Sequence, residues 1–541
     1  MLTGPLFMLQ VYDRVLGSRS EETLLALFLL MGFLFAMMGL LDFVRGRVLS
    51  RIGAQFQAAL DARVFAAVIK RASIMQGEAG GTNALRDLEA VQRLFASPVF
   101  AALFDIPWTP VFLIGITIFH PWLGMLAVFG GGALIIITIL NQVMTRGPVL
   151  ESNRATAQAE HFSEQIRTEA EMVRSLGMQN AAFTRWNSAR SKALSESVNS
   201  SDKSGGFTTL SKTFRLFLQS AMLGLGAYLV LNAGLTPGAM IASSILLGRA
   251  LAPLDLAIGQ WPSIQRAMKG WSTLAELLAT VPVEAERMPL PVPRAKLTVE
   301  QLTVVPPGEK QASLRMVSFD LAPGEALGVI GPSGSGKTTL ARALTGVWRP
   351  AGGKIRLDSA SLDQYDPDAL GKHIGFLPQR VQLFDGTIAD NIARLSTQPD
   401  AGKVIEAAKK AAAHEMILKL SDGYDTRVTS GGGRLSGGQI QRIGLARAMY
   451  GDPVFLVLDE PNSNLDNEGS QALNRAIRQM KSEGKSVMIM AHRPAAIEEC
   501  EKLLVLEMGA RRAFGPRDQV LKEVLANYKD VRQSAGPGGV T

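Results

Sequence analysis

The sequence has 541 residues, of which 47% are hydrophobic and only 19% are charged, and its mean hydropathy is +0.15. The length predicts several domains, and the apolar excess indicates a membrane protein. One cysteine, Cys500, excludes a disulfide framework. The net charge of +8 fits the Lys and Arg of cytoplasmic loops, so we expect no nucleic-acid partner.

The chain begins with a short apolar segment. From Leu2 to Tyr12 nearly every residue is apolar, but the run is about half of the roughly 20 residues that cross about 30 Å of hydrocarbon. It also lacks the basic region and the cleavage site of a signal peptide. We predict a helix that starts near mid-membrane, followed by a polar outer turn at 13–22. Because a helix end in hydrocarbon is costly, either earlier residues are missing or other helices shelter the segment.

Five longer apolar runs follow, and each is long enough to span a bilayer. They cover residues 23–44, 99–119, 122–143, 216–234 and 238–259. Together with the short first segment they predict an α-helical transmembrane domain of six helices over residues 1–280, in which the first helix is truncated.

The distribution of Lys and Arg predicts the orientation of these runs. The long connections after the first and third full runs are rich in both residues, whereas the short turns at 120–121 and 232–237 contain neither. The positive-inside rule therefore places the long connections and the C-terminal half in the cytoplasm. Helical patterning of the connections predicts that the helices extend well beyond the bilayer.

Three charged residues lie within or near the predicted spans: Asp105, Arg249 and Asp255. Ionisable groups at membrane depth usually face a cavity or an oppositely charged partner. Two interpretations stay open, namely that these residues line a transport path or that they pair between helices.

A proline-rich stretch, "VPVEAERMPLPVP", begins at residue 281 and predicts a linker over 281–295. After it, short β-rich runs alternate with helical patterns, which is typical of a soluble α/β domain. We place this domain at 296–530. The last residues, 531–541, are predicted to form a disordered tail.

The α/β domain contains a phosphate-binding P-loop. "GPSGSGKT", from Gly331 to Thr338, fits G-x-x-x-x-G-K-[ST] between a strand pattern and a helix pattern. Backbone amides of such a loop and the following helix N-terminus bind phosphates. Lys337 is expected to contact the β- and γ-phosphates of ATP, and Thr338 to bind Mg²⁺. The candidate nucleotide-binding residues are Gly331, Pro332, Ser333, Gly334, Ser335, Gly336, Lys337, Thr338 and Thr339.

Downstream, "VFLVLDEP" is an apolar strand pattern that ends in two carboxylates. Asp459 is suited to bind Mg²⁺, and Glu460 to orient or deprotonate the attacking water. The alternative is an ordinary strand that ends in an acidic turn, which the P-loop in the same domain disfavours.

Between these motifs, "LSGGQ" at Leu435–Gln439 resembles the signature of ABC-transporter ATPases. Gln379 in "GFLPQ" resembles the Q-loop of that family, "SNLD" at 463–466 its D-loop, and His492 in "MAHRP" its switch histidine. The resemblance implies that Glu460, His492 and Gln379 act in ATP hydrolysis and that Thr338, Gln379 and Asp459 hold Mg²⁺. It further implies a homodimer with two composite sites, in which one copy's signature covers ATP bound to the other copy's P-loop. The signature residues involved are Ser436, Gly437, Gly438 and Gln439.

The family often stacks the adenine of ATP on an aromatic residue after the domain's first strand. The corresponding stretch here, "LTVVPPGEK", has no aromatic residue. We therefore expect only apolar contact from Val305 or Pro306.

Four stretches of the membrane half narrow the resemblance to the exporters of type I protein secretion. They are "LTGPLFMLQVYDRVL", "FDIPWTPVF", "AEMVRSLGM" and "ILLGRALAPLDLAIGQW". They look most like the branch that exports proteases, lipases and related proteins with C-terminal signals. In that family the opening segment is the outer part of the first transmembrane helix, so we expect a start codon assigned too far downstream.

The resemblance implies a multi-pass protein surrounded by lipid in the bacterial inner membrane, with a cytoplasmic ATPase domain. It implies a periplasmic adaptor, an outer-membrane channel and a secreted protein substrate as partners. An ABC exporter of lipids or small hydrophobic molecules is the main alternative, because it shares every ATPase motif. The intact catalytic set and the five spans disfavour a regulator that does not transport.

Overall fold

The computed structural model describes residues 2–74, 83–232, 234–283, 287–429, 433, 435–462, 467–491 and 497–523. Its main division into two compact units falls between Pro282 and Val283, inside the predicted linker. The first unit is helical, and the second contains the β-sheet. The predicted tail at 531–541 lies outside the described residues.

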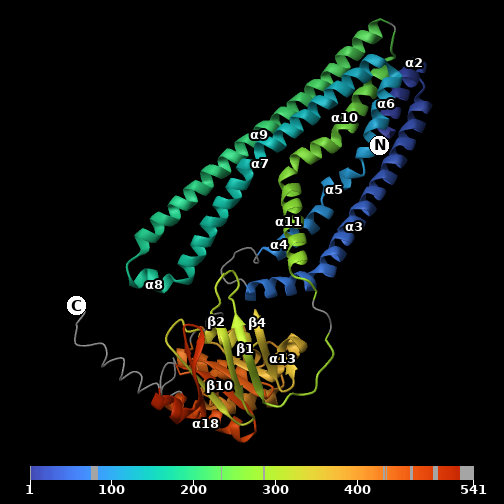
Figure 1. Ribbon diagram of the computed structural model, residues 1–541. Helices are drawn as coiled ribbons and strands as arrows, with labels where there is room; N and C mark the ends of the chain where they lie inside the picture. Colours follow the sequence, from blue (N-terminus) through green and yellow to red (C-terminus); the bar gives the residue numbers. More distant parts are fainter. Residues whose placement is uncertain are drawn as a thin grey trace. The chain divides into compact units, whose positions relative to one another are not determined.

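The helical unit confirms the membrane-spanning prediction. Among the described residues, five helical segments are long and apolar enough to cross a membrane: 21–74, 98–119, 121–168, 179–231 and 237–259. The helices, shown in Figure 1, are α1 (Thr3–Gln10), the π-helical η1 (Val11–Val15), α2 (Leu16–Ser18), α3 (Glu21–Ile74), α4 (Ala84–Phe95), α5 (Pro98–Leu103), the 3-10 helix η3 (Ile106–Trp108), α6 (Thr109–Phe119), α7 (Pro121–Thr168), α8 (Ala170–Ser175), α9 (Gln179–Leu231), α10 (Pro237–Gly259) and α11 (Trp261–Thr280).

Three of these helices are much longer than a bilayer is thick. α3 has 54 residues, α7 has 48 and α9 has 53, and at about 1.5 Å per residue each is more than twice as long as about 30 Å of hydrocarbon. The predicted extension beyond the membrane is therefore confirmed. α7 and α9 lie side by side, and a Cβ atom at Gly130 would come within 2.3 Å of Leu218. A glycine at this contact lets the two helices approach closely.

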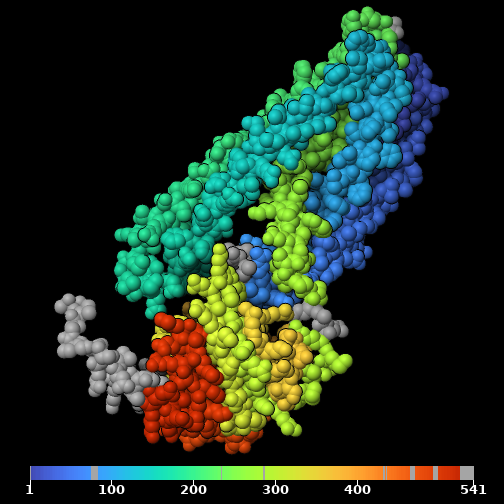
Figure 2. Space-filling view, viewed as in Figure 1, coloured from blue at the N-terminus to red at the C-terminus, as the bar shows by residue number. Residues whose placement is uncertain are grey.

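α10 is the most enclosed of the spanning helices. It packs against α9, α6 and α1, and it contributes Leu246, Leu247 and Leu251 to the apolar core of the helical unit. Beyond its end, α11 diverges from the α7–α9 arm, as the lime and teal segments show in Figure 2.

Asp13 fixes the outer end of α10. Its Oδ1 accepts a hydrogen bond from the amide of Gly238 at 2.7 Å, and its Oδ2 accepts one from the Thr236 hydroxyl, also at 2.7 Å. Thr236 in turn accepts from the amide of Ala239 at 3.2 Å. A Cβ atom at Gly238 would lie 2.5 Å from the Asp13 carboxylate, so a larger residue there would displace Asp13. These bonds satisfy amides that a helix N-terminus leaves without intrahelical partners.

The predicted outer turn at 13–22 is shorter than expected. The chain stays helical through Ser18 and turns at Arg19, whose φ is +53°. Asp13, which falls inside the predicted turn, is helical and accepts hydrogen bonds at the start of α10.

The second unit is built on a mixed ten-stranded sheet with the order β5-β4-β1-β2-β12-β11-β3-β10-β9-β6. Its strands are β1 (Leu297–Val304), β2 (Leu314–Leu321), β3 (Ala326–Ile330), β4 (Gly352–Leu357), β5 (Ala360–Ser361), β6 (Ile374–Leu377), β9 (Phe455–Asp459), β10 (Ser486–Met490), β11 (Lys502–Glu507) and β12 (Ala510–Pro516). β7 (Gly386–Thr387) and β8 (Arg427–Val428) form a separate pair.

Helices cover this sheet and enclose two apolar cores. They are α12 (Lys337–Leu344), η4 (Leu362–Gln364), α13 (Pro367–His373), α14 (Ile388–Ile392), α15 (Ala401–Lys410), α16 (His414–Leu418), η5 (Gly423–Asp425), α17 (Gly437–Met449) and α18 (Asn467–Ser482). Every residue of β9 and β10 is buried, as expected of parallel strands covered on both faces. The predicted α/β domain is confirmed.

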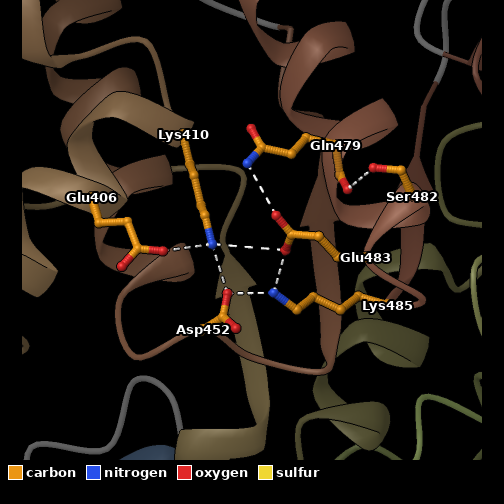
Figure 3. Close-up of polar contacts among 7 residues, drawn as sticks. All are labelled: Glu406, Lys410, Asp452, Gln479, Ser482, Glu483 and Lys485. Atoms are coloured by element: carbon orange, nitrogen blue, oxygen red, sulfur yellow. Dashed lines mark hydrogen bonds and ion pairs between the residues drawn. The ribbon is translucent and has the colours of Figure 1, made fainter.

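A network of ion pairs ties α15 to the loops that flank β9 and β10 (Figure 3). Lys410 binds Asp452 at 2.7 Å and Glu406 at 3.0 Å, and Lys485 binds Glu483 at 2.5 Å and also contacts Asp452. Both lysines are largely buried. Burial opposes the charge of Asp452, but hydrogen bonds from the two lysines outweigh it and lower the pKa of Asp452. The hydrogen bond from Lys485 likewise lowers the pKa of Glu483.

We predict that Asp13→Ala destabilises the helical unit by about 1–2 kcal/mol, because two donors at the start of α10 lose a charged acceptor. The measurement is the thermal unfolding midpoint of the purified full chain in detergent. Asp42→Ala is the matched control, since Asp42 is exposed and makes no ion pair or hydrogen bond among the described residues. Equal midpoints for the two variants would contradict the role given to Asp13.

We predict that Asp452→Asn lowers the free energy of unfolding of the full chain by about 1 kcal/mol at neutral pH. The lowered pKa means that Asp452 stabilises the fold fully above the ordinary aspartate pKa of about 3.9 and loses this contribution as the pH falls further. Asparagine tolerates the φ of +61° found at this position.

Urea denaturation of wild type and Asp452→Asn at pH 7.5 and at pH 3 measures this effect. The difference between the two proteins is expected to shrink at the lower pH. Asp425→Asn, a change at an exposed aspartate, is the control. A difference that is independent of pH would show that the charge of Asp452 does not cause it.

Candidate functional site

The site lies at the carboxyl ends of neighbouring parallel strands. β10 pairs with both β3 and β9, so that Met490 is level with Val329 on one side and with Asp459 on the other. β6 lies next to β9, with Leu377 level with Leu458. β9 ends in Asp459, and the segments that follow these strand ends carry the P-loop, Glu460 and Gln379. In parallel α/β sheets this edge is where ligands bind.

The P-loop connects β3 directly to α12 and is shaped by its glycines. At Gly336 the φ is +99°, and a Cβ atom would lie 2.6 Å from the side chain of Leu314. At Gly331 a Cβ atom would lie 2.3 Å from the carbonyl oxygen of Leu506. Neither position accommodates a side chain, so the backbone itself lines the loop. α12 begins at Lys337, and its N-terminal amides face this cradle for an anion.

Lys337 reaches back across the loop. Its Nζ donates to the carbonyl oxygens of Gly331 at 2.8 Å and Pro332 at 3.0 Å. Burial lowers the pKa of Lys337, while the carboxylates of Glu460 and Asp459 act in the opposite direction. The ammonium group is therefore held in place before any phosphate binds.

Asp459 and Thr338 meet beside this lysine. Asp459 is only 2% exposed, and burial raises the pKa of its carboxyl group, although a hydrogen bond from Thr338 acts against that rise. A buried carboxylate next to a hydroxyl oxygen suits a hard divalent cation that also binds phosphate oxygens. Ser335 Oγ is buried as well and has no hydrogen-bond partner in the described part of the chain. The residues present thus fit a nucleotide with Mg²⁺.

Glu460 and Gln379, far apart in the sequence, are brought together. Gln379 Nε2 donates to Glu460 Oε2 at 3.0 Å. The backbone of Glu460 has a φ of +51°, and its amide donates to the carbonyl oxygen of Met490 at 2.9 Å. Two predicted elements, His492 and the segment 463–466, lie outside the described residues.

The signature stretch caps α17. Ser436 and Gln439 form a reciprocal capping box: Gln439 Oε1 accepts from the Ser436 amide at 2.8 Å, and Ser436 Oγ accepts from the Gln439 amide at 3.3 Å. One turn later, Gln441 donates to the carbonyl oxygen of Pro461 at 3.2 Å, which links α17 to the turn after the acidic pair. Among the described residues, no hydrogen bond joins Ser436 or Gln439 to the P-loop of the same chain.

Comparison with known proteins identifies the family of both the ATPase unit and the helical unit. Residues 314–463 match the ABC transporter family, and residues 1–252 match the ABC transporter transmembrane region. The type I secretion system ATP-binding protein PrsD of Rhizobium meliloti is 43% identical over 534 residues, which covers 99% of this chain and 92% of PrsD. The chain belongs to the ABC transporters of type I secretion systems.

One further relative is also a secretion protein, and one solved structure shares the exporter fold. The cyclolysin secretion/processing ATP-binding protein CyaB of Bordetella pertussis is 28% identical and is aligned over 96% of the transporter and 74% of CyaB. The solved structure of a bacterial Atm1-family ABC exporter with ATP bound matches with a TM-score of 0.82 and 25% identity, over 99% of the transporter and 96% of that chain. The predicted fold, an exporter-type helical domain joined to an ABC ATPase domain, is confirmed, and the transporter couples ATP hydrolysis to transport.

The predicted adenine contacts stay a prediction. Pro306 is buried and Val305 is half-buried just after β1. Neither side chain is aromatic, so the reason for expecting apolar contact alone is unchanged.

Arg394 is a residue that the sequence gave no reason to select. Its Nε donates to the carbonyl oxygen of Arg447 at 3.0 Å and its Nη2 to that of Ala448 at 2.9 Å. Its Nη1 contacts the carbonyl oxygen of Gly371 on α13. Carbonyl groups at a helix C-terminus lack intrahelical partners and carry partial negative charge, so an arginine there stabilises the helix. Arg394 therefore holds the end of α17 opposite to Ser436; no motif surrounds it.

We predict that Arg394→Lys lowers ATP turnover about tenfold, since a lysine cannot bind three carbonyl oxygens in one plane and small displacements of catalytic groups are costly. Binding of ATP to the P-loop should be unchanged. Steady-state hydrolysis and fluorescent-nucleotide titration of the purified transporter measure the two quantities. Arg349→Lys, at an exposed arginine, is the control; a parallel loss of ATP affinity would argue against a specific effect on α17.

Proposed function

We propose that the transporter is the energising component of a type I secretion system and exports unfolded proteins with C-terminal signals across the bacterial inner membrane. The observation that carries this proposal is the 43% identity to a type I secretion protein over 99% of the chain. The likeness includes the membrane half, which distinguishes this class from exporters of lipids or small hydrophobic molecules. The ATPase motifs alone do not make that distinction.

The working unit in this proposal is a homodimer. α17 presents N-terminal amides at Gly437 and Gly438 that have no intrahelical acceptor, and its dipole favours an anion there. The same chain's P-loop makes no hydrogen bond to Ser436 or Gln439 among the described residues. A second copy supplies the anion that this helix end favours, because the ATP bound to its P-loop brings a γ-phosphate there. Two such sites then form, and both have complete catalytic sets.

Each residue of the site has a defined task in hydrolysis. Lys337 and the amides of the P-loop bind the β- and γ-phosphates. Glu460 accepts a proton from the attacking water, and Gln379 orients Glu460 through the hydrogen bond of 3.0 Å. His492 is the other polar side chain that contacts the γ-phosphate in this proposal. Thr338, Gln379 and Asp459 would hold Mg²⁺, which would supply positive charge to neutralise the phosphate oxygens.

The cellular setting follows from the same family. The ATPase unit and the long helical extensions lie in the cytoplasm, as the positive-inside rule predicts. Lipid surrounds the spanning helices, and a periplasmic adaptor and an outer-membrane channel continue the route to the medium. Closure of the ATPase dimer on ATP and its reopening after hydrolysis drive the change in the membrane half.

Glu460→Gln tests this function. We expect one or a few large proteins to disappear from the growth medium and to accumulate inside cells that carry the variant, because ATP binds but is not hydrolysed. Mass spectrometry of medium and cell fractions identifies these proteins. Glu300→Gln, at an exposed glutamate on β1, should leave the set of secreted proteins unchanged.

An unchanged set of secreted proteins in cells with Glu460→Gln, together with confirmed loss of ATPase activity, would refute protein export. It would favour export of lipids or small hydrophobic molecules, which lipid-stimulated ATPase activity of the wild type would then reveal.

A further inference from the structure

The three charged residues that the sequence predicts at membrane depth have different environments in the structure. Asp105 forms an ion pair with Arg45 at 3.1 Å, and Asp255 forms one with Arg215, also at 3.1 Å. Asp105, in the turn after α5, therefore pairs with α3, and Asp255 on α10 pairs with α9. Arg249 differs: in the described part of the chain it makes no ion pair or hydrogen bond, and its side chain is exposed.

Arg249 lies deep in the spanning part of α10. Thr236 caps this helix at its outer end, and Arg249 lies roughly 18 Å along the axis from Pro237 at about 1.5 Å per residue. Because the hydrocarbon layer is about 30 Å thick, this position is close to its middle. An unpaired guanidinium exposed to lipid at that depth is costly, so such residues face water or an anionic partner.

The face of α10 that carries Arg249 is the one that the other helices leave uncovered. Residues on the opposite side, such as Ser243, Leu247 and Leu251, are buried. Ile245 and Ala252 are half-buried, and Leu256 is exposed. Positions 245, 249, 252 and 256 follow the spacing of one helix face. Along this face Arg249 is the only charged residue, so the helix supplies no anion for it.

A tight contact between two copies of this face does not provide the missing anion. In a twofold dimer, a face near the axis meets the same face of the second copy. Two Arg249 side chains would then approach each other, and their like charges would repel. The charge favours a water-filled gap along this face.

We propose that Arg249 faces the aqueous path of the exported polypeptide and binds its acidic side chains and terminal carboxylate in passing. This inference rests on the protein export proposed above. A guanidinium forms paired hydrogen bonds with a carboxylate, and in a hydrated path this contact is weak enough to release the moving chain.

A single introduced cysteine tests whether water reaches this position. Cys500, the one native cysteine, is 2% exposed, and burial raises its pKa to about 12, so its thiol stays unreactive. Arg249→Cys then carries the one reactive thiol. Phe33→Cys on α3 is the control, because Phe33 is 63% exposed and lies at the same distance from the outer end of its helix.

Both variants are treated in membranes with a charged methanethiosulfonate reagent. We expect the thiol at position 249 to react at least about tenfold faster than that at position 33, because only a hydrated thiol ionises. Equal slow rates would place residue 249 against lipid and overturn the proposal. A spontaneous disulfide between two copies of Arg249→Cys, with protection from the reagent, would identify a contact between subunits and overturn it as well.

The assigned ligand is tested with Arg249→Gln, Arg249→Lys and two versions of one exported protein. The second version has its Asp and Glu residues outside the C-terminal signal replaced by amides. We expect Arg249→Gln to slow export of the acidic version several-fold and Arg249→Lys to restore most of it, with ATPase activity retained. The neutral version should be exported at one rate by all three transporters.

Equal slowing of both versions by Arg249→Gln would overturn the ligand assignment. No export of either version by the wild type would refute the proposed function itself, whereas the thiol measurement would still decide whether water reaches Arg249.

Discussion

The register between β3, β10 and β9 is the constraint on which the ATPase site depends. Because Met490 is level with both Val329 and Asp459, the P-loop and the acidic pair start from the same height on the sheet. A shift of one residue would turn Asp459 toward the other face of the sheet and remove it from Thr338. Complete burial of β9 and β10 makes such a shift costly, since it would exchange well-packed apolar side chains.

Hydrogen bonds at both ends also fix the position of the signature helix, α17. Ser436 and Gln439 satisfy its first amides, Gln441 ties it to the turn after Asp459 and Glu460, and Arg394 binds its last carbonyl groups. Its position is therefore coupled directly to the turn that follows Asp459 and Glu460. A helix held in this way can carry changes at the nucleotide to the rest of the domain as a rigid element.

Within the membrane, low polarity imposes a stricter rule on charged groups. Asp13, Asp105 and Asp255 each find a donor on another helix, and these contacts fix α10, α3 and α9 relative to their neighbours. Arg249 has no such partner in the described chain. The two ion pairs hold segments of the helical unit together, whereas the proposed contact with the exported chain rests on the unpaired Arg249.

The sequence by itself determined the spans, the α/β domain, the P-loop, the acidic pair and the signature, because apolar periodicity and short phosphate-binding motifs are local properties. It also predicted that Gln379 and Glu460 act together, but only through resemblance. What the tertiary structure decided are contacts between distant segments: Asp13 with α10, Arg394 with the end of α17, and the partners of Asp105 and Asp255. No local pattern predicts these contacts, because the same charged residue type can form an ion pair, cap a helix or face water. Only the packing of the folded chain decides which of the three occurs.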